Sequence, residues 1–224
     1  MENNDQENIN DIPYSFEEKV FDLQQNGYRF AWEAYIREAY RIFRENPGHF
    51  IVYSGIWLLL MGLFNYFFTS PMNALSGVVS APLFLGYGAA VIKLREDGTL
   101  RIADFLAPFD RFVELLLGVI VTSILVAIGF VLLVIPGIFL AFALILTPYF
   151  IYFERQGFWE AIRGSRRVVQ KKWFSFFVFL IVLSLINVLG VLVFYVGLFV
   201  TMPITGIAMF LAYEDVFHGT GNYV

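Results

Sequence analysis

Residues 135–173 read IPGIFLAFALILTPYFIYFERQGFWEAIRGSRRVVQKKW, and two different patterns meet inside this stretch. The run from Gly137 to Phe153 carries no charged residue and ends at Glu154, which is typical of a helix that crosses a membrane. Beyond it, apolar residues recur at three- and four-residue steps and basic residues fill the other side, which predicts an amphipathic helix in the membrane interface with its basic face toward the lipid headgroups. Its apolar positions are Phe158, Ala161, Ile162, Ser165, Val168 and Val169, and its basic positions include Arg163, Arg166, Arg167, Lys171 and Lys172.

Composition places the whole chain in the membrane class. At 58% hydrophobic and 15% charged residues, with a mean hydropathy of +0.68, it lies far from the roughly 45–50% apolar and roughly 25% charged residues of a soluble domain. Its 224 residues suffice for about six helices of ~20 residues, with no length left for a separate catalytic domain. The absence of cysteine excludes disulfides and thiolate metal sites. We therefore expect one all-α integral membrane bundle.

Four regions follow from the order of polar and apolar segments. We predict a disordered acidic tail (1–14), two cytoplasmic amphipathic helices (15–46), a six-span membrane domain (47–215) and a cytoplasmic tail (216–224). Within the first helix, Ser15 and Glu18 have capping-box spacing, and Gly27 is expected to end it. The predicted spans are Phe50–Phe68, Leu75–Leu94, Leu115–Val134, Gly137–Phe153 and two halves of Trp173–Tyr213 that divide near Val193–Gly197.

Small residues and prolines mark the second, fourth and sixth spans as an inner layer. Small residues let helix backbones approach closely where lipid supplies no hydrophobic drive, so we expect the second span to pack through Gly77, Ala81, Gly86 and Gly88. Proline removes a backbone donor and breaks helices. The predicted helix breaks are Pro82, Pro136, Pro148 and Pro203, of which Pro136 belongs to a tight Pro136–Gly137 turn.

Charge placement orients the chain. Every Lys, Arg, Asp and Glu lies in residues 1–45, 93–114, 154–172 or 214–215, and the three alternate loops have none. The positive-inside rule then predicts six spans with both termini in the cytoplasm. No charge falls in the middle of a span, which weighs against a membrane-buried proton relay.

An internal repeat is one interpretation of this order. Amphipathic helices precede spans one, three and five, and the triplet Trp32-Glu33-Ala34 returns as Trp159-Glu160-Ala161. Three duplicated hairpins would produce the pattern, and so would any three-hairpin protein with cytoplasmic loops.

A resemblance to a known family covers the second half of the chain. Its residues are Ile135-Pro136-Gly137-Ile138, Pro148, Glu154, Ala161-Ile162, Ser165, Trp173, Gly197, Thr201-Met202-Pro203 and Tyr213-Glu214-Asp215. In order and spacing they resemble the bacterial membrane domain fused to some glycerophosphodiester phosphodiesterases, and its uncharacterised stand-alone relatives. The resemblance implies a polytopic domain of the bacterial inner membrane. In the fused members a separate soluble barrel performs catalysis, and nothing in this chain matches that barrel.

The chemical inventory predicts no catalytic residues, cofactor or metal site. His49 and His218 are the only histidines, whereas a catalytic zinc or iron site normally needs three or more converging ligands. Asp104, Asp110 and Glu114 share a loop with basic residues, which favours a solvated face over a carboxylate site. We interpret the many aromatic residues as lipid-facing bulk and interfacial anchors, so nucleic acid is not an expected partner.

Three functional hypotheses remain. The first is a non-enzymatic inner-membrane protein that binds lipid, a partner membrane protein or a second copy of itself, with anionic headgroups at Arg163, Arg166, Arg167, Lys171 and Lys172. The second is a small transporter or lipid-moving protein with a cavity around proline-broken spans. The third is a membrane enzyme acting on lipid phosphates, which lacks a nucleophile or metal set.

Overall fold

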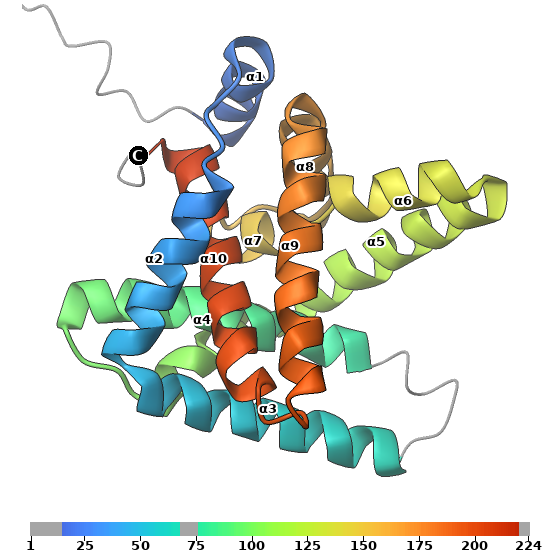
Figure 1. Cartoon of the computed structure of the whole chain (residues 1–224). Helices are drawn as coiled ribbons and strands as arrows, with labels where there is room; N and C mark the ends of the chain where they lie inside the picture. Colours follow the sequence, from blue (N-terminus) through green and yellow to red (C-terminus); the bar gives the residue numbers. More distant parts are fainter. Residues whose placement is uncertain (1–14, 68–75, 220–224) are drawn as a thin grey trace, which may run out of the picture.

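The computed structural model describes residues 15–67 and 76–219, and these residues form helices without a strand (Figure 1). In Figure 1, α10 lies between α2 and α9, α3 crosses below them, and the α5–α6 hairpin extends to one side. The elements are α1 (Phe16–Asn26), α2 (Trp32–Glu45), α3 (Pro47–Phe67), α4 (Ser76–Asp97), the 3₁₀ helix η3 (Ile102–Arg111), α5 (Phe112–Leu132), α6 (Val134–Ala143), α7 (Thr147–Tyr152), α8 (Phe158–Lys171), α9 (Trp173–Leu192) and α10 (Leu198–His218).

Local signals set the ends of the first helix. Ser15 and Glu18 form the predicted capping box, in which the Ser15 N–H donates to Glu18 Oε2 at 2.8 Å. These hydrogen bonds from Ser15 hold the pKa of Glu18 below its usual value. Gly27, with a φ of 76°, ends α1 as expected.

Five segments are long and apolar enough to cross a membrane, in a search confined to the described residues. They are Pro47–Phe67, Ile102–Leu132, Val134–Tyr152, Trp173–Leu192 and Leu198–His218. The second predicted span corresponds to α4, which is not among them, and residues 68–75 beside it lie outside the described part of the chain. A membrane crossing by the second predicted span, and with it the total of six spans, therefore stays a prediction. The predicted division at Val193–Gly197 is confirmed, because α9 and α10 meet there through Phe194 and Tyr195 in left-handed conformations.

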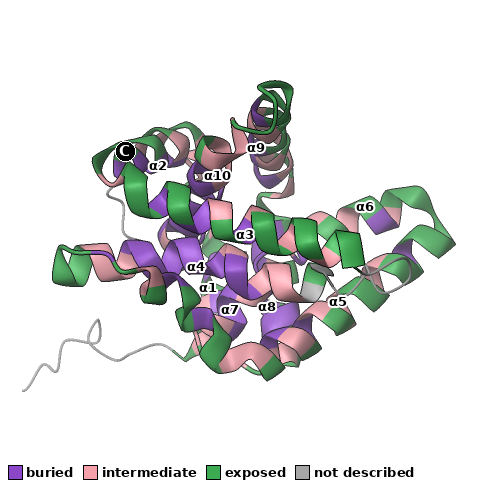
Figure 2. Ribbon diagram, turned by 90° about the horizontal axis from the view of Figure 1, so that it is seen from below, coloured by how far each residue is buried: buried purple, intermediate pink, exposed green. Residues whose placement is uncertain are grey.

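Burial separates an inner layer from an outer one. In the most apolar window of each segment, 67% of the residues of α10 and 44% of those of α6–α7 are buried, against 22% in α3, 17% in η3–α5 and 22% in α9. In α4, the run from Leu85 to Val91 is buried without interruption. Figure 2 shows buried residues gathered on α4, α7 and α10 and exposed ones along α3 and the α5–α6 hairpin. The predicted inner layer of the second, fourth and sixth spans is confirmed.

Gly88 lies where the three inner helices meet. A Cβ atom at this position would lie 2.5 Å from the Phe210 ring of α10 and 3.1 Å from Phe153, which follows α7. Gly86 is equally confined, because a Cβ atom there would meet the Phe105 carbonyl oxygen of η3. The sequence prediction fails at Gly77, which is exposed and has open space at its Cβ position within the described structure. Ala81 is half-buried.

One packing contact between successive hairpins occurs three times, and the three contacts connect the hairpins in a closed ring. The helix that precedes each hairpin packs along the inner helix of the hairpin before it, so that η3 packs along α4 and α8 along α7. The ring closes because α2, ahead of the first hairpin, packs along α10 of the last one. A cyclic pattern of this kind favours three duplicated hairpins over a coincidence of loop placement.

Only one of the four predicted helix breaks is found. The α6–α7 break lies immediately before Pro148, which occupies the first turn of α7. Pro82 and Pro203 stand inside the continuous helices α4 and α10. Pro136 lies in the first turn of α6, where a missing N–H has no helical partner to lose. Proline breaks a span only where another element satisfies the freed backbone groups, which the amino acid alone does not reveal.

Two predicted boundaries are also revised. The turn between the third and fourth spans lies at Leu133, which is extended, rather than at Pro136–Gly137. Gly137 instead packs in the hairpin, where its Cα atom lies 2.9 Å from a Cβ built on Gly129. The predicted tail 216–224 begins too early, because Val216 and Phe217 are buried in α10.

Candidate functional site

The break between α6 and α7 sits inside a candidate membrane span. Pro148 has no N–H, and its ring would clash with the Leu144 carbonyl of a continuous helix. The chain therefore turns at Leu144–Leu146, and the Thr147 N–H donates to the Leu144 carbonyl at 3.1 Å. A helix break leaves backbone groups that need partners where lipid offers none.

Ser165 of α8 supplies partners on both sides of this break. Its hydroxyl donates to the Ala143 carbonyl at 2.8 Å and accepts from the Leu146 N–H at 3.1 Å. The residue is completely buried. Because Ser165 lies on the predicted apolar side of α8, that side packs against the protein at the break and along α7.

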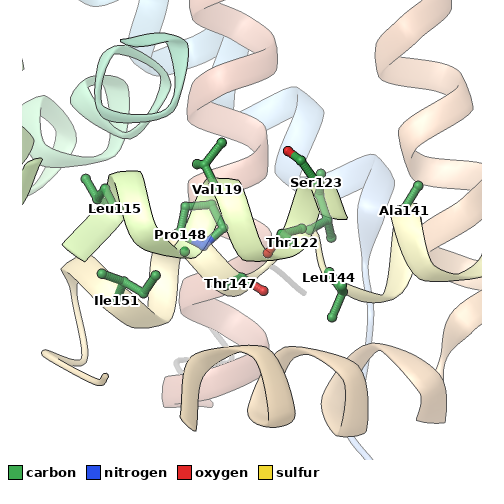
Figure 3. A pocket seen from close by; sticks show the side chains of 11 residues that line it. Leu115, Val119, Thr122, Ser123, Ala141, Leu144, Thr147, Pro148 and Ile151 are labelled. Atoms are coloured by element: carbon green, nitrogen blue, oxygen red, sulfur yellow. The ribbon is translucent and has the colours of Figure 1, made fainter. Parts of the chain in front are cut away.

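A pocket of about 190 Å³ opens beside the break, between α5, α6 and α7 (Figure 3). Its walls are mainly apolar, and none of the residues that line it is charged. Gly118 of α5 lets α7 pack closely against α5 at one end of the pocket, because a Cβ atom there would meet the side chain of Ile151. The other lining residues include Thr122, Ser123, Ala141, Thr147 and Pro148.

Two threonine hydroxyls in this pocket have no hydrogen-bond partner among the described residues. They are Thr122 Oγ1 and Thr147 Oγ1, two buried oxygens of residues that line the pocket, and Figure 3 shows where the two side chains lie on α5 and α7. Thr147 is only 1% exposed. A threonine in a helix can donate to the carbonyl one turn back, as Thr205 does to the Thr201 carbonyl at 2.8 Å, and these two do not.

Arg111 of η3 bonds to Ile151, which lines the pocket, but Arg111 is not itself a lining residue. Its guanidinium donates from Nη1 to the carbonyl of Ile151 at 3.0 Å and pairs with Glu114 at 3.4 Å. The side chain is 17% exposed, so this charge is used to anchor the end of α7. The pocket itself offers hydroxyls and methyl groups, a chemistry that suits a neutral ligand.

The five predicted lipid-binding residues, four in α8 and Lys172 directly after it, do not converge on one site. Arg163 pairs with Glu160 on its own helix at 3.0 Å. Arg167 pairs with Glu17 of α1 at 3.0 Å, and Lys171 Nζ donates to the Gln25 carbonyl at 3.1 Å. Arg166 and Lys172 are exposed and form no ion pair within the part of the chain that the structure describes. Three of the five basic residues predicted to bind lipid headgroups thus have partners within the protein.

A polar cluster missed by the sequence reading ties the segment after α7 to α10. The Tyr213 hydroxyl donates to Glu154 Oε1, and His218 Nε2 lies 2.9 Å from the same oxygen. Nearby, the Tyr35 hydroxyl of α2 donates to Asp215 at 2.5 Å. The Tyr213-Glu214-Asp215 motif therefore joins surface helices to the inner layer, and its one sequence signal is its position at the end of a span.

The described residues contain no candidate metal centre. Among the described residues, no three His, Asp or Glu side chains come together in a way that could hold a metal ion. Thr122 and Thr147 likewise have no histidine, lysine or carboxylate beside them in the pocket wall.

Comparison with known proteins gives one partial match. The chain is similar to a bacterial membrane protein. It is 32% identical over 103 residues to a UPF0259 membrane protein of Pectobacterium carotovorum subsp. carotovorum (strain PC1), and the match covers 44% of this chain and 40% of that protein. No family model matches, and no solved structure matches. Together with the five apolar helices, this relative supports a membrane protein related to an uncharacterised bacterial membrane family.

The relative does not extend the resemblance to the glycerophosphodiester phosphodiesterases. Its name states a membrane protein and gives no activity. Because the chain spans about 40% of the relative's length, the role of the whole relative is not carried over.

Proposed function

We propose that this protein is a non-enzymatic inner-membrane protein that binds a neutral amphiphile from the bilayer in the pocket between α5, α6 and α7. One observation carries the proposal: Thr122 and Thr147 line a mainly apolar pocket, and their buried hydroxyls have no hydrogen-bond partner among the described residues. A buried hydroxyl that lacks a hydrogen bond costs about 1–3 kcal/mol, which a ligand with a polar head would recover.

The size of the pocket limits the ligand. An apolar cavity of about 150 Å³ binds benzene, so 190 Å³ accommodates a short stretch of acyl chain with one polar group. A complete phospholipid is far larger. The proposed ligand is therefore the end of one lipid chain or a small amphiphile such as a medium-chain alcohol.

The absence of charge in the pocket wall favours a neutral head. Each threonine hydroxyl can donate one hydrogen bond and accept others, which suits an alcohol or an ester carbonyl. A carboxylate or phosphate would lose its hydration without gaining a cation, because the nearby Arg111 is bonded to Ile151 and Glu114. The same lack of an adjacent base argues against threonine as a nucleophile.

Lipid movement is the second candidate function. The Pro148 break favours it, since transporters use broken helices to build binding sites within the membrane. One observation argues against it. The helices α4 and α10 continue without a break past Pro82 and Pro203, so the described structure has no second broken span facing the α6–α7 break.

Photolabelling tests the binding proposal. A diazirine derivative of 1-octanol is added to the protein in nanodiscs, and labelled peptides are identified by mass spectrometry. We expect label on the walls of the pocket, and about fivefold less of it in Thr147→Val, because one hydrogen bond to the ligand is worth about 1 kcal/mol.

Thr201→Val is the matched control. The Thr201 hydroxyl is also buried without a partner among the described residues, but it lies in α10, outside the pocket. The control should leave pocket labelling unchanged. Label spread evenly over the exposed apolar helices, or equal labelling of the pocket in Thr147→Val, would refute the proposal.

A further inference from the structure

The first helix, α1, lies on the basic helix α8 and matches its charge. From Phe16 to Asn26, α1 has three acidic residues and one basic residue, a net charge of −2. From Phe158 to Lys171, α8 has four basic residues and one acidic residue, a net charge of +3. The two helices pack against each other although they are far apart in the sequence.

Two neighbouring residues of α1, Phe16 and Glu17, make the contacts with α8 on which the inference rests. Phe16 occupies the space above Gly164, where a Cβ atom would lie 2.6 Å from its ring, and it packs edge-to-face on Phe150 with 5.1 Å between ring centroids. Glu17 pairs with Arg167 at 3.0 Å. One residue thus fills an apolar notch in α8 while the next brings an anion to a cation beside that notch.

The same surface has the chemistry of an anionic-phospholipid site. Arg167 and Lys171 are one helical turn apart, and only Lys172 separates α8 from α9, a candidate membrane span. The two cations therefore lie close to the start of a span, at the depth where headgroups meet basic residues. The notch at Gly164 lies beside them and would take an acyl chain, as it now takes the Phe16 ring.

The contacts of α1 would allow it to leave the surface of α8. Two of its residues, Val20 and Leu23, are buried. Gly27, in a left-handed conformation, ends the helix, and residues 28–31 lead to α2. A short helix with few buried side chains opens at a lower free energy than the core does.

We propose that α1 covers a binding site for anionic phospholipid on α8, with Glu17 in the place of the phosphate and Phe16 in the place of an acyl chain. Anionic lipid and α1 then compete for Arg167, Lys171 and the Gly164 notch. The site is separate from the pocket between α5 and α7 and does not depend on a ligand there.

Two measurements on the full chain test this competition. Native mass spectrometry counts phosphatidylglycerol retained by the purified protein, with phosphatidylcholine as the neutral reference. Hydrogen exchange of residues 16–26 is compared in nanodiscs of the two lipids. We expect α1 to exchange faster in phosphatidylglycerol, and Phe16→Ala and Glu17→Gln to retain more of that lipid than the native chain.

Matched variants separate this site from general electrostatics. Arg167→Gln combined with Lys171→Gln should lower the affinity for phosphatidylglycerol by about fivefold for each charge removed and should abolish the gain from Phe16→Ala. Arg37→Gln combined with Arg44→Gln removes the same charge from α2, and Glu33→Gln removes an exposed carboxylate there; both should have little effect.

Two results would overturn the proposal. One is equal exchange of α1 in the two lipids together with unchanged lipid retention in Glu17→Gln. The other is a gain from Phe16→Ala that persists without Arg167 and Lys171. Circular dichroism and melting of each variant confirm that the remaining helices are intact.

Discussion

Ser165 shows how one side chain permits an irregular backbone inside a membrane helix. It lies 22 residues after Ala143 and 19 after Leu146, yet its hydroxyl serves the backbone of both. Ser54 and Ser184 illustrate the ordinary alternative, in which the hydroxyl donates to a carbonyl of its own helix. A helix break near Pro148 therefore depends on a residue of α8 as much as on the proline.

Ser165→Ala should destabilise the protein, because it leaves the Ala143 carbonyl and the Leu146 N–H buried without their partner. Unsatisfied buried backbone groups cost about 1–3 kcal/mol each. We expect a clearly lower midpoint of thermal unfolding in detergent. Ser184→Ala is the control, since this exposed hydroxyl bonds within α9. Equal melting of the two variants would show that Ser165 does not support the break.

The elements divide into inner helices that touch each other and outer helices that touch lipid. Small residues allow the inner contacts, as where Gly206 of α10 faces the Tyr87 ring of α4. Aromatic pairs complete the layer, including Tyr149 with Tyr213 at 5.2 Å and Phe153 with Phe210 at 5.2 Å between ring centroids. Without a hydrophobic drive between helices, this close packing is the main source of association.

Gly88→Leu should separate the inner helices, because its side chain would enter the space of Phe210 and Phe153. Leu59→Phe is the comparison, since Leu59 on α3 is 63% exposed. We expect Gly88→Leu to lower the melting temperature in detergent and Leu59→Phe to leave it nearly unchanged. A similar fall for both would contradict the division into layers.

At the scale of the whole molecule, charge and packing agree on one arrangement. In Figure 1 the end of α10 and the helix α1 lie on one side, and the turn between α9 and α10 lies on the other. That turn is uncharged, whereas the ends near α1 carry Glu214, Asp215 and the basic residues of α8. The charged helices α1 and α8 and the end of α10 therefore lie together, away from that turn, while α2 runs from one side to the other.

This arrangement predicts where reporter fusions are active. Alkaline phosphatase fused after Phe194 should be active in the periplasm, and fusions after Arg101 or Gly164 should be inactive, because their charged loops stay in the cytoplasm. Activity is measured in intact cells, with immunoblots to control for expression. Phosphatase activity after Arg101 or Gly164 would contradict the six-span topology.

The sequence by itself determined the features that depend on local chemistry. Apolar runs predicted the membrane helices, the capping box at Ser15 placed the start of α1, and the apolar run after Trp173 divided where expected. The inner layer was also predictable, because small residues at Gly86 and Gly88 are useful only where helices approach closely. Each of these signals acts over a few turns of one helix, so no distant contact was needed to read it.

Only the tertiary structure decided what those helices touch. An apolar helix face suits lipid and protein equally, so periodicity could not show that α8 packs at the α6–α7 break. The charges of Arg167 and Lys171 are met by α1, in the first case by a residue 150 positions away. The pocket lined by Thr147 likewise exists because α5 lies beside α6 and α7, a packing relation that no one of these segments encodes alone.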